Sequence, residues 1–222
     1  MNSLFPIAAA SLLLFAACNN APEAPKANAT DAQAVTTPAA GKTYTVDVAQ
    51  SSVGWIGTKP TGKHNGTFMI KDGNLMATDN AVTGGQFTID MASIKALDQD
   101  AEGNTKLAGH LSSPDFFEVA KYPTSTFQIT EVKPGIAGLT DVDSNLLKGA
   151  THTVTGNFTM KGVTKSITFP AKVTMNPTEV MADANFNIDR TQWGLIYGND
   201  KGLGDKFINP MVNLNIHLVG KG

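Results

Sequence analysis

Short runs in which apolar and polar residues alternate recur from about residue 43 to the end of this chain. The sharpest run covers residues 211–219, where every second residue is a large aliphatic one: Val212, Leu214, Ile216 and Leu218. A period of two puts alternate side chains on opposite faces of a β-strand, and the β-branched and aromatic residues in these runs favour strands. About eight such runs predict an all-β fold, an antiparallel sheet that closes into a barrel or packs as a sandwich.

Glycine-containing dipeptides mark the turns between these runs. Lys161-Gly162 predicts a tight hairpin between residues 151–160 and 163–175, and Asp72-Gly73 predicts another after residues 67–71. Residues 59–66 (KPTGKHNG), just before this second hairpin, are rich in turn-forming residues and predict a loop. A closed barrel has no free strand edge, which suits an exported protein, and both a monomer and a homodimer are compatible with it.

One connection, residues 107–129, departs from the strand pattern. It begins like a short helical turn, and residues 93–102 before it suit either a short helix or an acidic loop. Pro114 then biases the chain away from the helix, and Phe116 and Phe117 follow directly. We expect this segment to form a plug that places two aromatic rings under the open end of the β structure.

The N-terminal segment is not expected to belong to the fold. Leu4 to Ala17 is apolar and about as long as a signal-peptide core, whereas a membrane-spanning helix needs roughly 20 residues. The only cysteine, Cys18, follows at once, and the segment resembles a bacterial lipobox, in which the cysteine is acylated after cleavage. Residues 1–18 are therefore predicted to be a lipoprotein signal peptide; an ordinary secretory signal with a chance cysteine is the alternative. Acylation of Cys18 would anchor an exported protein to the periplasmic side of a bacterial membrane.

Composition divides the rest of the chain into two parts. Residues 19–42 are rich in Ala, Pro, Thr and Asn and hold few large apolar residues, which predicts a disordered tether with a span of roughly 25–30 Å. Residues 43–222 suit one domain with a sizeable core. The tether would leave this domain close to the bilayer but free to turn.

Several functional classes lack support in the composition. One cysteine excludes an intramolecular disulfide, and the four histidines have no metal-ligand spacing, so neither a metal nor another cofactor is expected. The net charge of −2 arises from mixed charges, which gives no basic surface for nucleic acid. No nucleophile with its base and no paired carboxylates are recognisable, so an enzyme is not expected.

Three blocks of sequence resemble the signature segments of the YceI-like family. They are residues 110–127 (HLSSPDFFEVAKYPTSTF), 155–170 (TGNFTMKGVTKSITFP) and 189–199 (DRTQWGLIYGN). The resemblance extends over roughly Thr43 to Val219. It implies an exported bacterial protein with an extended lipocalin-like antiparallel β-barrel, whose apolar tunnel holds an isoprenoid lipid such as a prenyl quinone or polyprenyl phosphate. The family's usual Arg-Asp pair before the first block is replaced here by Leu107-Ala108.

Large apolar residues of the inward parity are the candidates for the tunnel wall, together with the plug and two tryptophans near the mouths. The predicted ligand-binding residues are Trp55, Phe68, Phe87, Ile89, Phe116, Phe117, Phe127, Phe158, Phe169, Phe186, Ile188 and Trp193. The alternative for this set is a solid core. His110 could contact a lipid head group or make a structural hydrogen bond. Lys59, Lys63 and Arg190 could meet a phosphate, although solvated loop charges are the simpler interpretation.

The sequence thus predicts a protein that binds an isoprenoid lipid and carries or sequesters it, without a catalytic centre. Two alternatives stay open. A wall of Phe and Met selects weakly among apolar tails, so the ligand could be another amphiphile. A barrel with a filled interior and an exposed apolar patch would instead be an interaction module for another envelope protein.

Overall fold

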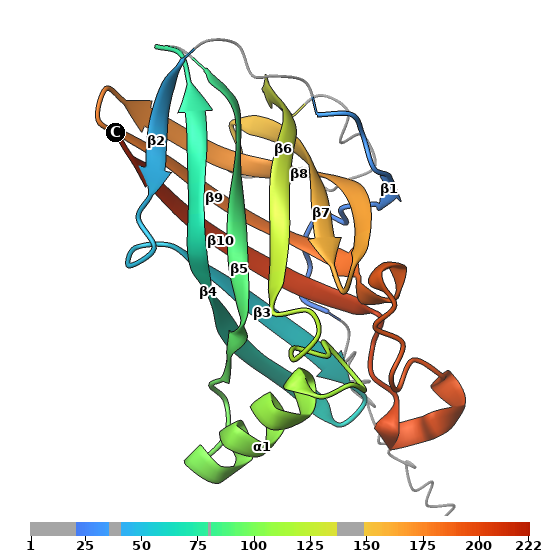
Figure 1. The fold of residues 1–222 in the computed structure, drawn as a ribbon. Coiled ribbons are helices and arrows are strands. Elements are labelled where there is room, and N and C mark those ends of the chain that lie inside the picture. The colour runs from blue at the N-terminus through green and yellow to red at the C-terminus, as the bar shows by residue number, and fades with distance from the viewer. Residues whose placement is uncertain (1–20, 36–40, 80, 137–148) are drawn as a thin grey trace, which may run out of the picture.

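The computed structural model describes residues 21–35, 41–79, 81–136 and 149–222, and these form a closed antiparallel barrel (Figure 1). The barrel has eight strand positions, which we call staves. They are occupied by β3 (Ser52–Lys59), β4 (Gly62–Ala77), β5 (Val82–Ala96), β6 (Thr124–Pro134), β7 (His152–Met160), β8 (Val163–Asn176), β9 (Glu179–Asp189) and β10 (Met211–Lys221). Each pairs with the next in sequence, and β10 pairs with β3 to close the ring. The predicted all-β barrel is confirmed, whereas the predicted signal peptide, residues 1–18, lies outside the described residues.

A ninth short strand, β2 (Lys42–Val46), completes the stave that β3 begins. It pairs with the C-terminal parts of β4 and β10, while β3 pairs with their other parts. Asp47 accepts hydrogen bonds from the amides of Ala49 and Gln50 in the turn that separates the two strands. The carboxylate also meets Lys221 at 2.9 Å. Because one stave is split in this way, the barrel has eight positions although more strands are present.

The two predicted hairpin turns have opposite outcomes. Lys161 and Gly162 join β7 to β8 with φ of 50° and 75°, the left-handed conformation that a two-residue hairpin requires. Asp72 and Gly73, by contrast, lie inside β4, where the pairing with β5 shifts register. A Cβ atom on Gly73 would approach the Phe87 Cβ to 2.8 Å, so this glycine permits close approach of β5 rather than a turn. The chain reverses earlier, between β3 and β4, and most of the predicted loop is strand.

Four connections gather at one end of the barrel, which we call the mouth end. They are the turns β3–β4 and β7–β8, the β5–β6 connection with helix α1 (Ala101–Ser112), and the β9–β10 connection with the 3-10 turns η2 (Arg190–Trp193) and η3 (Lys201–Lys206). The Asp100 carboxylate caps α1 by accepting from the Gly103 amide at 2.7 Å. The helix ends just before Pro114. It starts later than the predicted short helix because β5 continues to Ala96.

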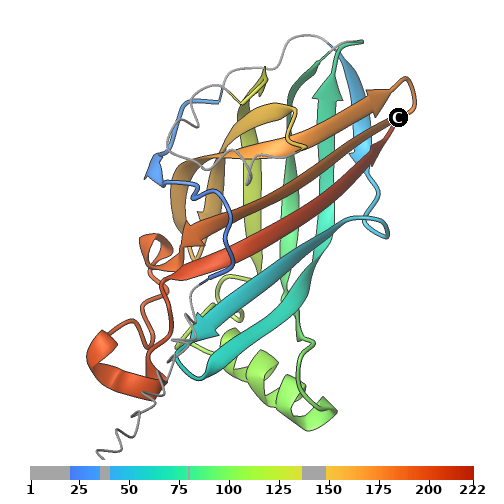
Figure 2. The ribbon, with the colours of Figure 1, turned by 180° about the vertical axis from the view of Figure 1, so that it is seen from behind.

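Residues 21–35 form a segment that we call the strap, which runs across the outer side of the barrel (Figure 2). The sequence predicted a disordered tether over residues 19–42, and for the strap the structure differs. Its strand β1 (Thr30–Asp31) pairs with β8, and Lys26 forms a bridge with Asn187 of β9. Ala27 is only 2% exposed. The strap is held by backbone hydrogen bonds, which a prediction based on apolar content does not register.

The strap lies where β8 and β9 separate. These strands pair only as far as Ala171 and Ala184, so toward the mouth end both have an edge without its barrel neighbour. The Asn187 amide donates to the Pro25 carbonyl and its carbonyl accepts from the Ala27 amide, both at 2.8 Å. The Asn187 side chain also donates to the Pro22 carbonyl at 2.8 Å. The strap therefore supplies partners to backbone groups that would otherwise be unpaired.

Asn187 gives a test of this role. Asn187→Ala removes the side-chain bonds to the strap and to Asn213, so we expect it to lower the free energy of unfolding by about 1–3 kcal/mol. Asn215→Ala is the matched control. Asn215 lies on the same face of β10 as Asn213 but is exposed, so its loss should lower the free energy of unfolding by about 0.5 kcal/mol or less. Urea unfolding of both variants measures the difference. Equal stabilities would show that the asparagine does not hold the strap.

Candidate ligand-binding cavity

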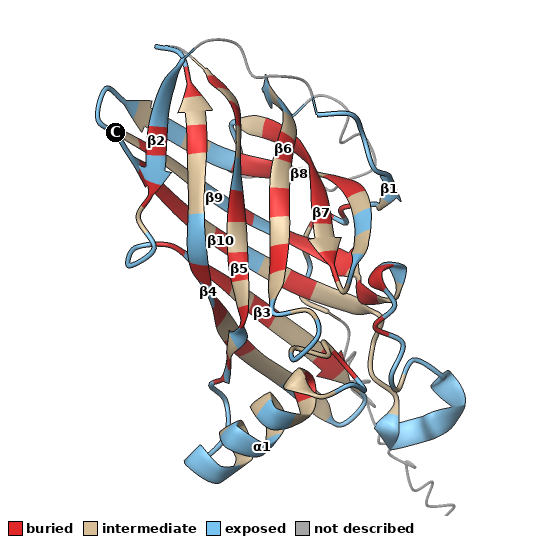
Figure 3. Cartoon of the chain, viewed as in Figure 1, coloured by how far each residue is buried: buried red, intermediate tan, exposed pale blue. Residues whose placement is uncertain are grey.

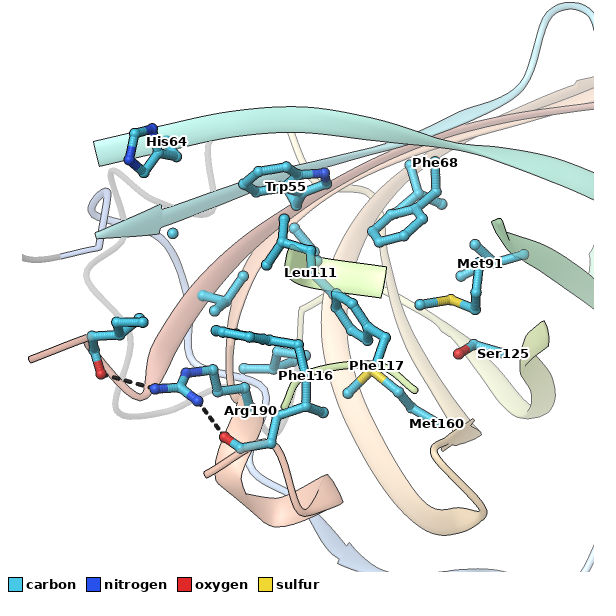
Figure 4. Close-up of a pocket in the computed structure, with 18 of the residues that line it drawn as sticks. Trp55, His64, Phe68, Met91, Leu111, Phe116, Phe117, Ser125, Met160 and Arg190 are labelled. Atoms are coloured by element: carbon cyan, nitrogen blue, oxygen red, sulfur yellow. Dashed lines mark hydrogen bonds between the residues drawn. The ribbon is translucent and has the colours of Figure 1, made fainter. Parts of the chain in front are cut away.

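The mouth half of the barrel encloses a cavity of about 390 Å³ (Figure 4). This volume lies in the range of roughly 300–1,000 Å³ that is typical of ligand pockets. Inward residues of the strands form most of its wall, and α1, the plug and the β9–β10 connection complete it. Its lining includes the exposed residues Tyr197, Asp205 and Lys206, so the cavity reaches the surface beside the β9–β10 connection.

The cavity brings together ten of the twelve predicted ligand-binding residues. They are Trp55, Phe68, Phe87, Ile89, Phe116, Phe117, Phe127, Phe158, Phe186 and Ile188. These residues come from six strands and the plug, so their meeting follows from barrel closure and inward parity. Their contact with a ligand stays a prediction.

The other two predicted residues lie elsewhere. Phe169 lines a second cavity of about 50 Å³ in the far half of the barrel, and it stacks on Phe186 with ring centroids 4.1 Å apart. Trp193 lines neither cavity; it is fully buried, and its indole N–H donates to the Phe158 carbonyl at 3.0 Å. Trp193 therefore supports the wall from behind rather than forming its surface.

A rank of four phenylalanines separates the two cavities. Phe87, Phe127, Phe169 and Phe186 follow one another across the lumen, with successive ring centroids 5.6, 5.5 and 4.1 Å apart. Phe87 and Phe127 line both cavities. Gly156 lies beneath Phe127, and a Cβ atom there would come within 2.4 Å of the ring. The lumen is thus open in its mouth half and largely filled beyond this rank.

The part of the plug between α1 and β6, residues 113–123, places both of its aromatic rings at the mouth end of the cavity. The Phe117 ring meets Phe68 edge-on, with centroids 5.6 Å apart, and the Phe116 ring lies 5.4 Å from that of Tyr197. The Phe117 amide donates to the Leu111 carbonyl at 3.0 Å, and Lys161 Nζ donates to the Phe116 carbonyl at 2.7 Å. The plug is therefore fixed to both α1 and the β7–β8 hairpin.

Arg190, the only arginine in the sequence, is buried and not solvated as its loop position suggested. Its guanidinium donates to four backbone carbonyls of the β9–β10 connection, those of Leu195, Tyr197, Ile208 and Asn209. Figure 4 shows the side chain and part of this set of bonds. Burial lowers the pKa of the group, against the opposing field of Asp189, yet a guanidinium remains protonated in proteins. The arginine thus holds this connection in shape, and most of its donors are already occupied.

The guanidinium also lies 5.7 Å from the centroid of the Phe116 ring. At this distance a cation is attracted to the face of an aromatic ring. The same side chain therefore joins the β9–β10 connection to the plug, the two segments that border the mouth.

Few polar groups face the cavity. The Ser125 side chain is 2% exposed and lies in the wall beside Met91 and Met160, and its hydroxyl makes no hydrogen bond to any residue that the structure describes (Figure 4). Near the mouth the His64 ring meets Asp98 at 2.9 Å. Burial by itself would raise the pKa of Asp98, but hydrogen bonds from the Asn65 amide and from His64 outweigh it and leave the pKa below its usual value.

Several wall residues were not predicted. Met91 and Met160 carry the inward parity of their strands and could have been found from it, as could Val53, Ser125 and Leu214. Leu195, Tyr197 and Ile208 belong to an aperiodic connection, so no local pattern marks them. Among the described residues, no three His, Cys, Asp or Glu side chains gather in a way that could hold a metal ion. No helix in the described part is long and apolar enough to cross a membrane.

A closed antiparallel barrel with an apolar cavity at one end has the architecture of lipocalin-like binding proteins. The YceI-like domain matches residues 44–220, and the chain belongs to this family.

Relatives named UPF0312 protein align over shorter stretches. One from Pseudomonas aeruginosa is 42% identical over 64 residues, which are 29% of this chain and 27% of that protein. One from Pseudomonas putida is 32% identical over 107 residues, 48% of this chain and 47% of that protein. The chain thus spans between about a quarter and a half of the length of these relatives.

Solved structures share the fold. BcnA from Burkholderia cenocepacia has a TM-score of 0.60 at 24% identity, covering 78% of this chain and 98% of that chain. A polyisoprenoid binding domain from Saccharophagus degradans, implicated in plant cell wall breakdown, has a TM-score of 0.57 at 18% identity, covering 81% and 98%. At these identities the likeness establishes the barrel and not the ligand.

The bonds from Arg190 to four carbonyls can be tested by substitution. Arg190→Lys keeps the positive charge but cannot reach four carbonyls, so we expect a loss of about 2–4 kcal/mol of stability. Amide hydrogen exchange of residues 195–209 should rise well above that of the parent protein. Lys201→Ala, on the exposed part of the same connection, is the control and should change neither. Unchanged exchange in Arg190→Lys would contradict the proposed role.

Proposed function

We propose that this protein binds a long-chain isoprenoid lipid, such as a prenyl quinone or polyprenyl phosphate, in the mouth cavity and carries or sequesters it. The observation that carries this proposal is the open, largely apolar cavity inside a closed barrel. The related fold of a polyisoprenoid binding domain supports the isoprenoid assignment. Such a ligand requires an apolar enclosure with few polar contacts.

Burial of the tail provides the driving force. Each methylene transferred from water contributes roughly 0.8 kcal/mol before ordering and association costs are subtracted. The wall residues Met91 and Met160 add adaptable side chains that follow an irregular chain. We place the tail among the phenylalanines and methionines and the head group near the mouth, where His64, His110 and Tyr197 line the cavity.

We further propose that the protein is exported and anchored through an acylated Cys18 on the periplasmic side of a bacterial membrane. This rests on the lipobox-like sequence before Cys18. An anchored carrier stays within reach of the membrane from which its lipid comes.

Another amphiphile is the closest competing ligand, because a wall of Phe and Met recognises apolar surface more than chemical identity. Organic extraction of the natively expressed protein followed by mass spectrometry decides between them. We expect a stoichiometric prenyl quinone or polyprenyl lipid. A different amphiphile would retain the cavity and overturn the isoprenoid assignment. A protein that yields no lipid and takes up no added prenyl lipid would favour the interaction-module alternative.

Position 125 tests the cavity itself. Ser125→Trp places an indole in the lumen between Met91 and Met160, so we expect bound lipid to fall at least about tenfold, the loss of roughly 1.4 kcal/mol or more. Thr126→Trp is the matched control, since the next residue of β6 points to the outer face and should keep its lipid. Circular dichroism and thermal unfolding verify that both variants fold. Equal lipid content in the two would exclude the lumen as the binding site.

A further inference from the structure

The strap brings the N-terminal end of the described chain to the mouth end of the barrel. Pro22 and Ala24 accept hydrogen bonds from the Asn187 side chain, and Asn187 lies two residues before the end of β9. Arg190, which lines the cavity, follows that strand directly. Ala21 is three residues from Cys18, so at most about 11 Å of extended chain separates the strap from the predicted anchor.

Two asparagines fasten the strap to the barrel. The Asn187 side chain holds the strap where it begins, as described above, and Asn157 of β7 holds it near its other end. The Asn157 side chain donates to the Gln33 carbonyl at 2.7 Å and accepts from the Gln33 amide at 2.9 Å. A free tether would let every face of the barrel approach a membrane. A fastened strap lets only the face near Ala21 do so.

Exposed apolar side chains gather at this same end. Of the eight large apolar residues that are exposed in the described part of the chain, four belong to mouth-end connections: Leu97, Ile196, Tyr197 and Leu203. Ile196 is 61% exposed and Leu203 45% exposed, and neither lines the cavity. Figure 3 shows the β9–β10 connection projecting beyond the barrel as an exposed loop. Ile196 and Leu203 thus give one projecting connection two exposed apolar side chains beside the cavity.

From these observations we infer that the mouth end docks on a phospholipid bilayer, with Ile196 and Leu203 inserted at its interface. The inference rests on the proposed function, because docking lets an isoprenoid tail pass between bilayer and cavity without crossing water. The charges on the projecting loop are mixed, Lys201 and Lys206 with Asp200 and Asp205. Contact is therefore mainly apolar and should depend only weakly on salt.

Site-specific fluorescence measures the orientation directly. The full-length lipidated protein is placed on vesicles of phosphatidylethanolamine and phosphatidylglycerol that contain spin-labelled lipid. A fluorophore is attached at Lys201→Cys on the mouth-end loop, or at Thr178→Cys in the exposed β8–β9 turn at the opposite end. We expect several-fold stronger quenching at position 201 than at position 178. Equal quenching, or none at 201, would overturn the inference whether or not the protein holds an isoprenoid lipid.

Variants of the exposed residues Ile196 and Leu203, which we call rim variants, test whether docking is needed for lipid exchange. Ile196→Glu combined with Leu203→Glu places two charges at the interface, so we expect transfer of a prenyl quinone between vesicles to slow about tenfold. Met69→Glu, an equally exposed apolar position on the barrel wall, is the control and should transfer at the parent rate. Quinone binding in detergent should stay unchanged in both variants. If the parent protein itself binds no quinone in detergent, that result would count against the proposed function and not against docking. Transfer at the parent rate in the rim variant would refute docking through this loop.

Discussion

Every strand of a closed barrel needs a hydrogen-bonding neighbour on each side, and β8 and β9 cease to provide this for each other beyond Ala184. Much of the mouth end compensates for that separation. The strap pairs with both exposed edges, and Trp193 fills the space behind the wall with its N–H bonded to Phe158. The cavity lies in the same half of the barrel as this separation, so the strap closes the wall beside it.

Arg190 solves a second problem at the same end. The long β9–β10 connection has little regular structure, and its carbonyls require donors if they are to be buried. One guanidinium supplies several donors in a planar fork, and it does so without a carboxylate partner at bonding distance among the described residues. The connection is therefore ordered around a cation. The same cation lies over the face of the Phe116 ring, so it also holds the plug to the β9–β10 connection.

The sequence predicted the barrel and ten of the residues that line its cavity, because both depend on local alternation and on resemblance to a family. Residues 211–219 show that parity reaches further than the predicted set: Val212, Leu214 and Ile216 share the inward parity of their strand and line the cavity, although they were not among the predicted ligand-binding residues. The hairpin turn predicted at Asp72-Gly73 was wrong because this dipeptide suits a bulge within a strand as well as a turn. The strap, Trp193 and Arg190 could not be placed, since each is fixed by partners far away in sequence. Backbone pairing over such separations leaves no periodic signal.

The rank of phenylalanines between the two cavities has a consequence for exchange rates. For the ligand proposed above, a tail short enough for the mouth half would enter without disturbing Phe87 or Phe127, whereas a longer one would first have to turn these rings aside. Both rings are packed against neighbours in strands that cannot move apart while the barrel stays closed. Turning them is therefore an activated step with its own temperature dependence. The barrel would discriminate tail lengths by how fast they load and leave, even where their equilibrium affinities are alike.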